Sequence, residues 1–189
     1  MWLDEITDKA KITNTSINDS EYAPALNGDN EFSNNKRAVE GEEWMTLSYS
    51  EWDYLIKTRT NASNLYGVAK VNGVKGLILL PDEWIDPKPD DKEFNSGLAN
   101  STVNEYTAAQ WSVMEASGAV FFPAAGCCDR ASHSAIGFGG GNSWGDYWTS
   151  TAMDKNNARY LTFTLGQVVW NDFKHNRNIR RSARLVRPL

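Results

Sequence analysis

Apolar residues follow a helical period in the stretch TLSYSEWDYLIKTR, residues 46–59. Starting from Trp52, they recur at the i, i+3 and i+4 positions that form one face of a helix. Ser48 and Glu51 have the spacing of a capping box, in which each residue's side chain bonds the backbone amide of the other. The pattern therefore predicts a helix over about residues 49–58.

A second amphipathic stretch begins at another capping box, formed by Thr107 and Gln110. Trp111 and Met114 lie three residues apart and are expected to face inward. Gly118 follows where a C-terminal cap belongs, because glycine readily adopts the left-handed backbone of such a cap. We predict a second helix between these two signals.

Short apolar runs predict the buried strands. Asn72-Gly73 between β-forming residues is a strong signal for a hairpin. The runs GLILLP, residues 76–81, and GAVFFP, residues 118–123, each hold a glycine, an apolar segment and a final proline. The chain therefore places a short buried strand after each predicted helix.

Two loops and a three-stranded meander complete the pattern. Residues 85–104 and the Gly- and Ser-rich residues 127–146 are predicted to be loops. Alternating residues beyond them predict three antiparallel strands, at ARYLTFTL (158–165), QVVWNDF (167–173) and SARLVR (182–187).

The first 40 residues are polar and weakly periodic, which predicts an irregular leader at residues 1–40 and one domain at 41–189. No apolar run reaches the length of a membrane span, and residues 1–11 lack the basic and apolar regions of a signal peptide. We therefore expect no membrane insertion.

Charge is distributed unevenly along the chain. The net charge is −5, yet residues 174–189 hold six Lys or Arg and no acid. The overall acidity argues against nucleic acid as a partner, although the basic run Lys174, Arg177, Arg180 and Arg181 could hold phosphate. Eight Trp, seven Tyr and seven Phe suit a binding surface as well as a core.

Little in the sequence points to catalysis. Cys127 and Cys128 are the only cysteines and are adjacent, so they cannot join distant segments. With only two histidines, a zinc site is not expected. No nucleophile and base stand at a recognisable spacing, which argues against an enzyme. We expect neither a metal nor a cofactor.

Five ordered motifs over roughly residues 40–189 resemble a family of gut bacteria: EEWMTLSYSEWDYLIKTR, VNGVKGLILLPDEW, YTAAQWSVMEASGAVFFPAAG, DYWTSTAMDKNNARYLTFTLG and SARLVRP. Members of that family have the C-type lectin fold. Several are variable proteins of diversity-generating retroelements, which rewrite adenine-containing codons near the 3′ end of the gene. This chain departs from the family pattern at Met45, where arginine is usual, and at Cys127-Cys128.

The resemblance implies a loop-rich α+β fold in which two helices pack on a twisted antiparallel sheet. It assigns Trp148 and the tryptophans of the framework motifs to the core, namely Trp44, Trp52, Trp84 and Trp111. It implies ligand binding by the C-terminal region, about residues 127–181. The expected ligand-binding residues are Asn142, Ser143, Trp144, Asp146, Trp170, Asn171, Phe173, His175, Asn176 and Asn178, and those from Trp144 onward are expected on one exposed patch.

The function that the resemblance implies is that of a non-enzymatic adhesin or receptor-binding protein. Its place would be a bacterial surface or a phage virion, and its ligand a protein or glycan on a cell surface. Two alternatives remain open. Trp170-Asn171-Asp172 matches the W-N-D calcium motif of sugar-binding lectins, although the partner motifs E-P-N and Q-P-D are absent. Formylglycine-generating enzymes share the fold, but their catalytic cysteines are separated in sequence.

Overall fold

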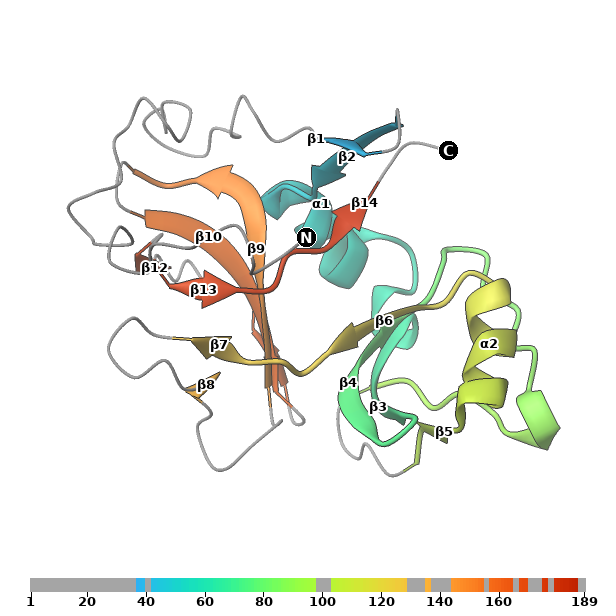
Figure 1. Cartoon of the computed structure of the whole chain (residues 1–189). Helices are drawn as coiled ribbons and strands as arrows, with labels where there is room; N and C mark the ends of the chain where they lie inside the picture. Colours follow the sequence, from blue (N-terminus) through green and yellow to red (C-terminus); the bar gives the residue numbers. More distant parts are fainter. Residues whose placement is uncertain are drawn as a thin grey trace.

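The computed structural model has the α+β architecture that the sequence predicts, with two short helices and several sheets that are mostly antiparallel (Figure 1). No helix of the described part is long and apolar enough to cross a membrane. The first strand begins at Arg37, inside the predicted leader. The residues described are 37–39, 42–97, 103–128, 135–136, 144–154, 157–164, 167–169, 175–176 and 179–186.

A four-stranded sheet of order β5-β3-β4-β6 builds one half of the molecule. Its elements are β3 (Tyr66–Val71), β4 (Val74–Leu79), β5 (Glu105–Tyr106) and β6 (Val120–Pro123). β3 and β4 form the predicted hairpin, and its turn residues Asn72 and Gly73 have φ values of 46° and 82°. Asn and Gly are the residues that tolerate this backbone best. Helix α2 (Ala108–Ala116) covers the side of the sheet that faces away from β9 and β10 (Figure 1).

Two long antiparallel strands build the other half, β9 (Trp144–Ala152) and β10 (Asn157–Thr164). The other edge of β10 holds β11 (Gln167–Val169) and then β12 (His175–Asn176). The predicted pairing of the strands at 158–165 and 167–173 is confirmed where the structure describes it. Val169 and His175 are six residues apart, whereas their partners Thr162 and Ala158 are four apart, so the register shifts between the two paired segments.

Two small sheets involve the ends of the domain. One is made by β1 (Arg37–Val39), β2 (Glu42–Thr46) and β14 (Leu185–Val186), and the other by β7 (Cys127–Cys128), β8 (Ala135–Ile136) and β13 (Arg180–Arg181).

These sheets correct two predictions. The meander is wrong at its last strand, because β14 pairs with β2 and not with β11. Alternation marks a strand without naming its partner, and this partner lies near the other end of the chain. The predicted loop over residues 127–146 is interrupted by β7, β8 and the start of β9. Two-residue strands are too short to produce a recognisable period.

Both predicted capping boxes are present. The Glu51 amide donates to the Ser48 hydroxyl, and the Glu51 carboxylate accepts from the Ser48 amide at 2.7 Å. Thr107 and Gln110 make the same reciprocal pair, and Gly118 after α2 has a φ of 94°. The first helix consists of α1 (Tyr49–Asp53) and a π-helical segment (Tyr54–Thr58) that continues it. Short 3-10 turns lie at Ala62–Asn64 and Pro89–Asp91. The predicted helix over residues 49–58 is thus confirmed.

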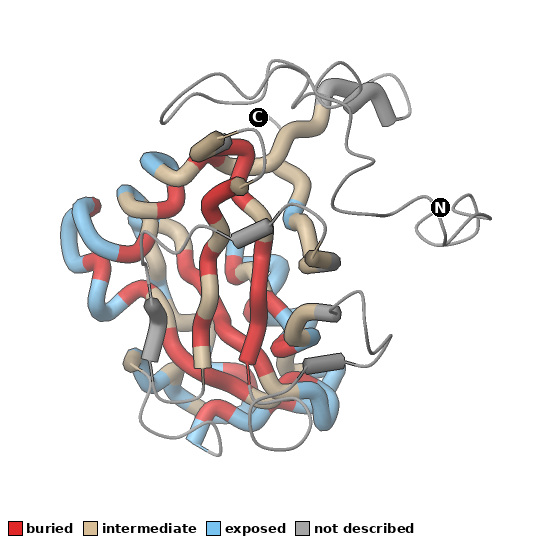
Figure 2. The backbone as a smooth tube through the Cα atoms, turned by 90° about the vertical axis from the view of Figure 1, so that its left-hand side faces the viewer, coloured by how far each residue is buried: buried red, intermediate tan, exposed pale blue. Residues whose placement is uncertain are grey.

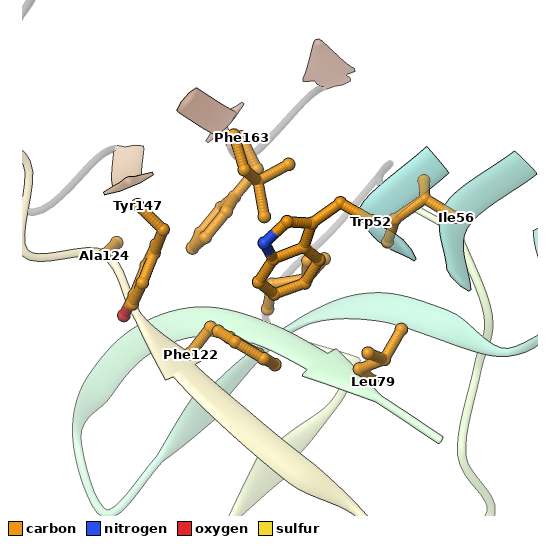
Figure 3. Close-up of a cluster of buried hydrophobic side chains, with 9 residues drawn as sticks. Trp52, Ile56, Leu79, Phe122, Ala124, Tyr147 and Phe163 are labelled. Carbon is orange, nitrogen blue, oxygen red and sulfur yellow. The ribbon is translucent and has the colours of Figure 1, made fainter. Parts of the chain in front are cut away.

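Two hydrophobic clusters form the interior. The first cluster joins the two halves and α1 (Figure 3), with Trp52, Ile56, Leu77, Leu79, Phe122, Ala124, Tyr147, Leu161 and Phe163. The second cluster joins the four-stranded sheet to α2, with Leu65, Ala69, Val71, Ile78, Leu80, Tyr106, Met114 and Ala119. Buried residues follow the central strands, and exposed residues gather at the turns (Figure 2).

The tryptophans are less deeply buried than the resemblance implies. Trp52 is 1% exposed, as expected of a core residue. Trp84 and Trp111 are only partly buried at the margin of the second cluster, and Trp44 and Trp148 are half-buried. The assignment of these four to the core is therefore wrong in degree. A tryptophan ring is large and carries one polar N–H, so it often keeps one edge at the surface.

Candidate functional site

The paired strands β9 and β10 present two different faces. Cross-strand pairing sets Leu161 opposite Tyr147, and both side chains belong to the first cluster. Side chains alternate along a strand. The pairs Tyr160–Trp148 and Thr162–Asp146 therefore share the outer face of these two strands.

Arg181 covers this outer face. Its Nε donates to the Asp146 Oδ2 at 3.1 Å, and the two side chains are 2% and 6% exposed. The guanidinium carbon lies 3.8 Å from the centre of the Tyr160 ring and 4.6 Å from that of the Trp148 ring. A planar guanidinium can form an ion pair at its edge and stack on aromatic faces at the same time. Arg181 does both and binds the tail to two strands.

Backbone bonds hold the tail in the same place. The Ser182 amide donates to the Asp146 carbonyl at 3.1 Å, and the Trp148 amide donates to the Ser182 carbonyl at 2.9 Å. One residue earlier, Arg181 pairs with Cys127 of β7. The tail therefore crosses from β7 over β9 before β14 joins β2.

Four of the short strands lie at one end of the molecule. β7, β8, β12 and β13 all lie on the side away from α2 (Figure 1). β7 is also attached to β9, since the Gly126 amide donates to the Trp144 carbonyl at 2.9 Å. The residues between these strands, including 129–134, 137–143, 170–174 and 177–178, lie outside the described residues.

Two of the expected ligand-binding residues are buried, so the prediction that they are exposed is wrong. Trp144 is 8% exposed and Asp146 is 5% exposed. Asp146 can be buried because Arg181 forms an ion pair with its carboxylate. A sequence pattern does not reveal this distant partner. Trp144 stands opposite Thr164 at the start of β9, where the amide of Gly126 bonds its carbonyl.

The other expected positions are only partly covered by the structure. His175 and Asn176 form β12, where their backbones pair with Ala158 and Asn157. The remaining six lie outside the described residues, namely Asn142, Ser143, Trp170, Asn171, Phe173 and Asn178. Asp172, and with it the W-N-D motif, is also outside.

Arg181, Asp146, Trp148 and Tyr160 form a cluster on the outer face that the sequence does not predict. Arg181 belongs to the basic run that could hold phosphate, and Trp148 was expected in the core. The structure instead brings both together with Tyr160 and Asp146. One sequence signal does point this way: Asp146 and Trp148 are two residues apart on a strand and so share a face.

The tyrosines of β9 and β10 stay protonated far above neutral pH. Burial raises the pKa of Tyr147 to about 12, and its hydroxyl donates to the Pro123 carbonyl at 2.8 Å. Burial also raises the pKa of Tyr160, while the nearby Arg181 acts in the opposite direction. Both phenols are therefore neutral at neutral pH, and each can donate one hydrogen bond while its oxygen accepts others.

Metal-ligating side chains do not gather in the described part of the chain, where no three His, Cys, Asp or Glu residues could hold one ion. The thiol of Cys127 is half-buried and free of a disulfide. Arg181 is committed to Asp146, so it is not a surface cation of the basic run. Among the described residues, the outer face is thus a structural support in which Trp148 and Tyr160 are half-buried.

Comparison of the chain with protein-family models, with curated proteins and with solved structures finds no match.

Proposed function

We propose that this is a non-enzymatic ligand-binding protein with the C-type lectin fold. Its ligand is a protein or glycan on a cell surface, and it binds through the end where β7, β8, β12 and β13 lie. The five motifs support this fold, and two helices with antiparallel sheets are compatible with it. The protein acts outside the cell, at a bacterial surface or on a phage virion.

The buried Arg181–Asp146 pair is the observation that carries the proposal. It fixes β13 on β9, so β10 and β13, the strands that flank residues 165–179, are both attached to β9. β7 and β9 flank residues 129–143, and they are joined because β7 pairs with β13 and the Gly126 amide bonds the start of β9. The strands on either side of both segments are thus fixed. Fixed ends lower the entropy that a binding segment loses when its ligand binds.

The composition of these segments suits recognition. They hold the polar residues Asn142, Ser143, Asn171, His175, Asn176 and Asn178 and the aromatic residues Trp170 and Phe173. Binding loops combine rigid aromatic anchors with small polar side chains that adapt their hydrogen bonds. Trp144 and Asp146 are buried, so they support the framework and do not touch the ligand.

A display library tests this division. The six polar positions are randomised together, the variants are displayed on yeast, and binders are selected against lysozyme as a folded probe protein. We expect display close to the wild-type level and selected binders after a few rounds. The control library randomises six exposed positions of the other half, Glu83, Ile85, Glu93, Ser112, Val113 and Glu115.

The control library should display equally well and give far fewer binders, because its positions lie on α2 and the loop before it, away from the proposed binding end (Figure 1). Loss of display from the first library would show that its positions hold the fold. Equal yields from both libraries would show that the C-terminal end has no special capacity to bind. Either result contradicts the proposal.

The proposal also assigns the variability to a retroelement. The prediction is a near-copy of the 3′ end of the gene beside a reverse transcriptase gene, with differences confined to adenines. A genome with no such copy would remove diversification from the proposal and leave ligand binding to the display experiment.

A further inference from the structure

An apolar groove runs beside the first helix, at a distance from the ligand-binding end. Its volume is about 350 Å³, and its lining includes Leu47, Ser50, Glu51, Tyr54 and Leu55. Leu47 and Leu55 also pack against the first cluster, so the floor of the groove is continuous with the core. Tyr54 is 49% exposed, so its side of the groove is open to solvent.

The polar groups of the groove already have partners. The Glu51 carboxylate accepts from the amide and the hydroxyl of Ser48, both at 2.7 Å. The Ser50 hydroxyl lies 3.2 Å from that of Ser48, and the Tyr54 hydroxyl donates to Asp82 at 3.4 Å. The groove therefore offers apolar surface, and an occupant has to supply an apolar side chain.

The register of β1 directs the preceding chain toward this groove. β1 is antiparallel to β2, with Arg37 opposite Trp44. A segment that continues β1 before Arg37 in the same register would run toward Thr46 and Leu47, which lines the groove. It would lie on the β1 side of β2, because β14 pairs with the other edge.

The chain before β1 offers one suitable side chain at the right distance. Residues 33–36 are Ser-Asn-Asn-Lys, and Phe32 is the first large apolar residue before them. A strand advances by about 3.3 Å per residue, so Phe32 reaches roughly 17 Å beyond Arg37. Leu47 is three residues, or roughly 10 Å, beyond Trp44. Phe32 can therefore extend past Leu47 to the first turn of α1.

We propose that the groove is the docking site of the chain's own segment at residues 30–34, with the Phe32 ring between Leu47, Tyr54 and Leu55. The docked segment extends the small sheet of β1, β2 and β14 and covers the exposed side of α1. It attaches the first 36 residues to the framework on a surface separate from the ligand-binding end. This inference does not depend on what that end binds.

Photo-crosslinking of the full chain tests the docking. Tyr54 is replaced with p-benzoylphenylalanine, a substitution that its exposure makes tolerable, and the irradiated protein is digested and mapped by mass spectrometry. A mixture of ¹⁵N-labelled and unlabelled chains separates bonds within one chain from bonds between two. The expected product joins residue 54 to the peptide that contains Phe32 of the same chain. Val113, which is 44% exposed on α2, carries the photo-reactive group in the control and should not give this product.

Phe32→Ala should abolish the cross-link, whereas Phe32→Leu should retain it. A cross-link between chains, a cross-link to another segment, or none at all would overturn the proposal. Hydrogen exchange gives a second readout that needs no photo-reactive group. Phe32→Ala should speed the exchange of amides in residues 49–58 and leave α2 unchanged, and unchanged exchange in both helices would also overturn the docking.

Discussion

The two halves of the molecule are held together by different interactions. The four-stranded sheet and α2 enclose the second cluster, and the ion pairs of this half, such as Lys70–Glu105 and Lys88–Glu93, lie at the surface. The β9–β10 half also uses the first cluster on its inner face, but its outer face is closed by the buried Arg181–Asp146 pair.

The two kinds of interaction differ in how strictly they fix the positions of the packed groups. Apolar burial is non-directional, so a sheet and helix can adjust to many side chains of similar size. A buried ion pair is stable only in one geometry, because a displaced partner leaves a desolvated charge. The β9–β10 half thus fixes the position of β13 on β9.

The largest effect should come from the cluster that both halves share. Trp52 is 1% exposed, and its ring meets that of Phe122 edge to face at 5.3 Å. Trp52→Ala should lower the free energy of unfolding by about 3–5 kcal/mol, because a large site is emptied. Trp111→Ala should cost clearly less, since Trp111 is only partly buried. Urea unfolding of the two variants measures this, and equal losses would contradict the account.

The buried ion pair gives the next test. Asp146→Ala leaves the Arg181 charge buried without its carboxylate and should cost about 3–5 kcal/mol. The matched change is Asp82→Ala, because Asp82 pairs with Arg59 at 2.9 Å but is 56% exposed. The Arg59 side chain is itself 2% exposed, but it also donates to the carbonyls of Leu55, Leu80 and Leu65, so this change should cost clearly less than Asp146→Ala.

Chemical denaturation of both variants compares the two pairs directly. The double variant Asp146→Ala with Arg181→Met should recover part of the loss, since it removes the unpaired charge. Equal costs for Asp146→Ala and Asp82→Ala would show that the buried pair has no special part in holding the tail.

Two glycines test the close packing of each half. A Cβ on Gly145 would lie 2.2 Å from the ring of Phe163, and a Cβ on Gly76 would lie 2.3 Å from the carbonyl oxygen of Phe122. Gly145→Ala and Gly76→Ala should each cost about 1–3 kcal/mol through overpacking. Phe163→Leu should relieve part of the first cost, while no side-chain change should relieve the second. Thermal melts of the single and double variants decide this, and additive losses at Gly145 and Phe163 would contradict it.

The smallest of the stability effects concerns the cap of α2. Thr107→Ala removes the hydroxyl that accepts from the Gln110 amide at 3.2 Å, and should cost about 0.5–2 kcal/mol. Thr107→Ser keeps an accepting hydroxyl and should retain most of the stability. A melt in which Ser is as damaging as Ala would show that the capping bond is not the cause.

Local signals in the sequence predict the first half well. Both capping boxes, the Asn72-Gly73 turn and the apolar runs after each helix involve residues within a few positions of one another. Such features are determined by local backbone geometry, which short sequence windows contain. The α+β class follows from the same signals.

The second half depends on contacts between distant residues, and there the sequence is a weaker guide. β14 pairs with β2, and Arg181 finds Asp146 across the sheet. Neither partner can be read from periodicity, because alternation gives the faces of a strand and not its neighbours. The buried state of Trp144 and Asp146 follows from these distant contacts, so their predicted exposure failed with them.

The most direct test of the account replaces six candidate ligand-binding residues at once. Asn142, Ser143, Asn171, His175, Asn176 and Asn178 are all changed to Ala, and the Tm is compared with those of the wild type and of Trp52→Ala. Exposed polar substitutions each fall within about 0.5 kcal/mol, and 1 kcal/mol shifts Tm by about 2–4 °C in a chain of this size. Because these small effects take either sign and partly cancel, the framework account predicts a Tm within about 5 °C of the wild type. A fall as large as that of Trp52→Ala would contradict it, because these residues would then hold the fold.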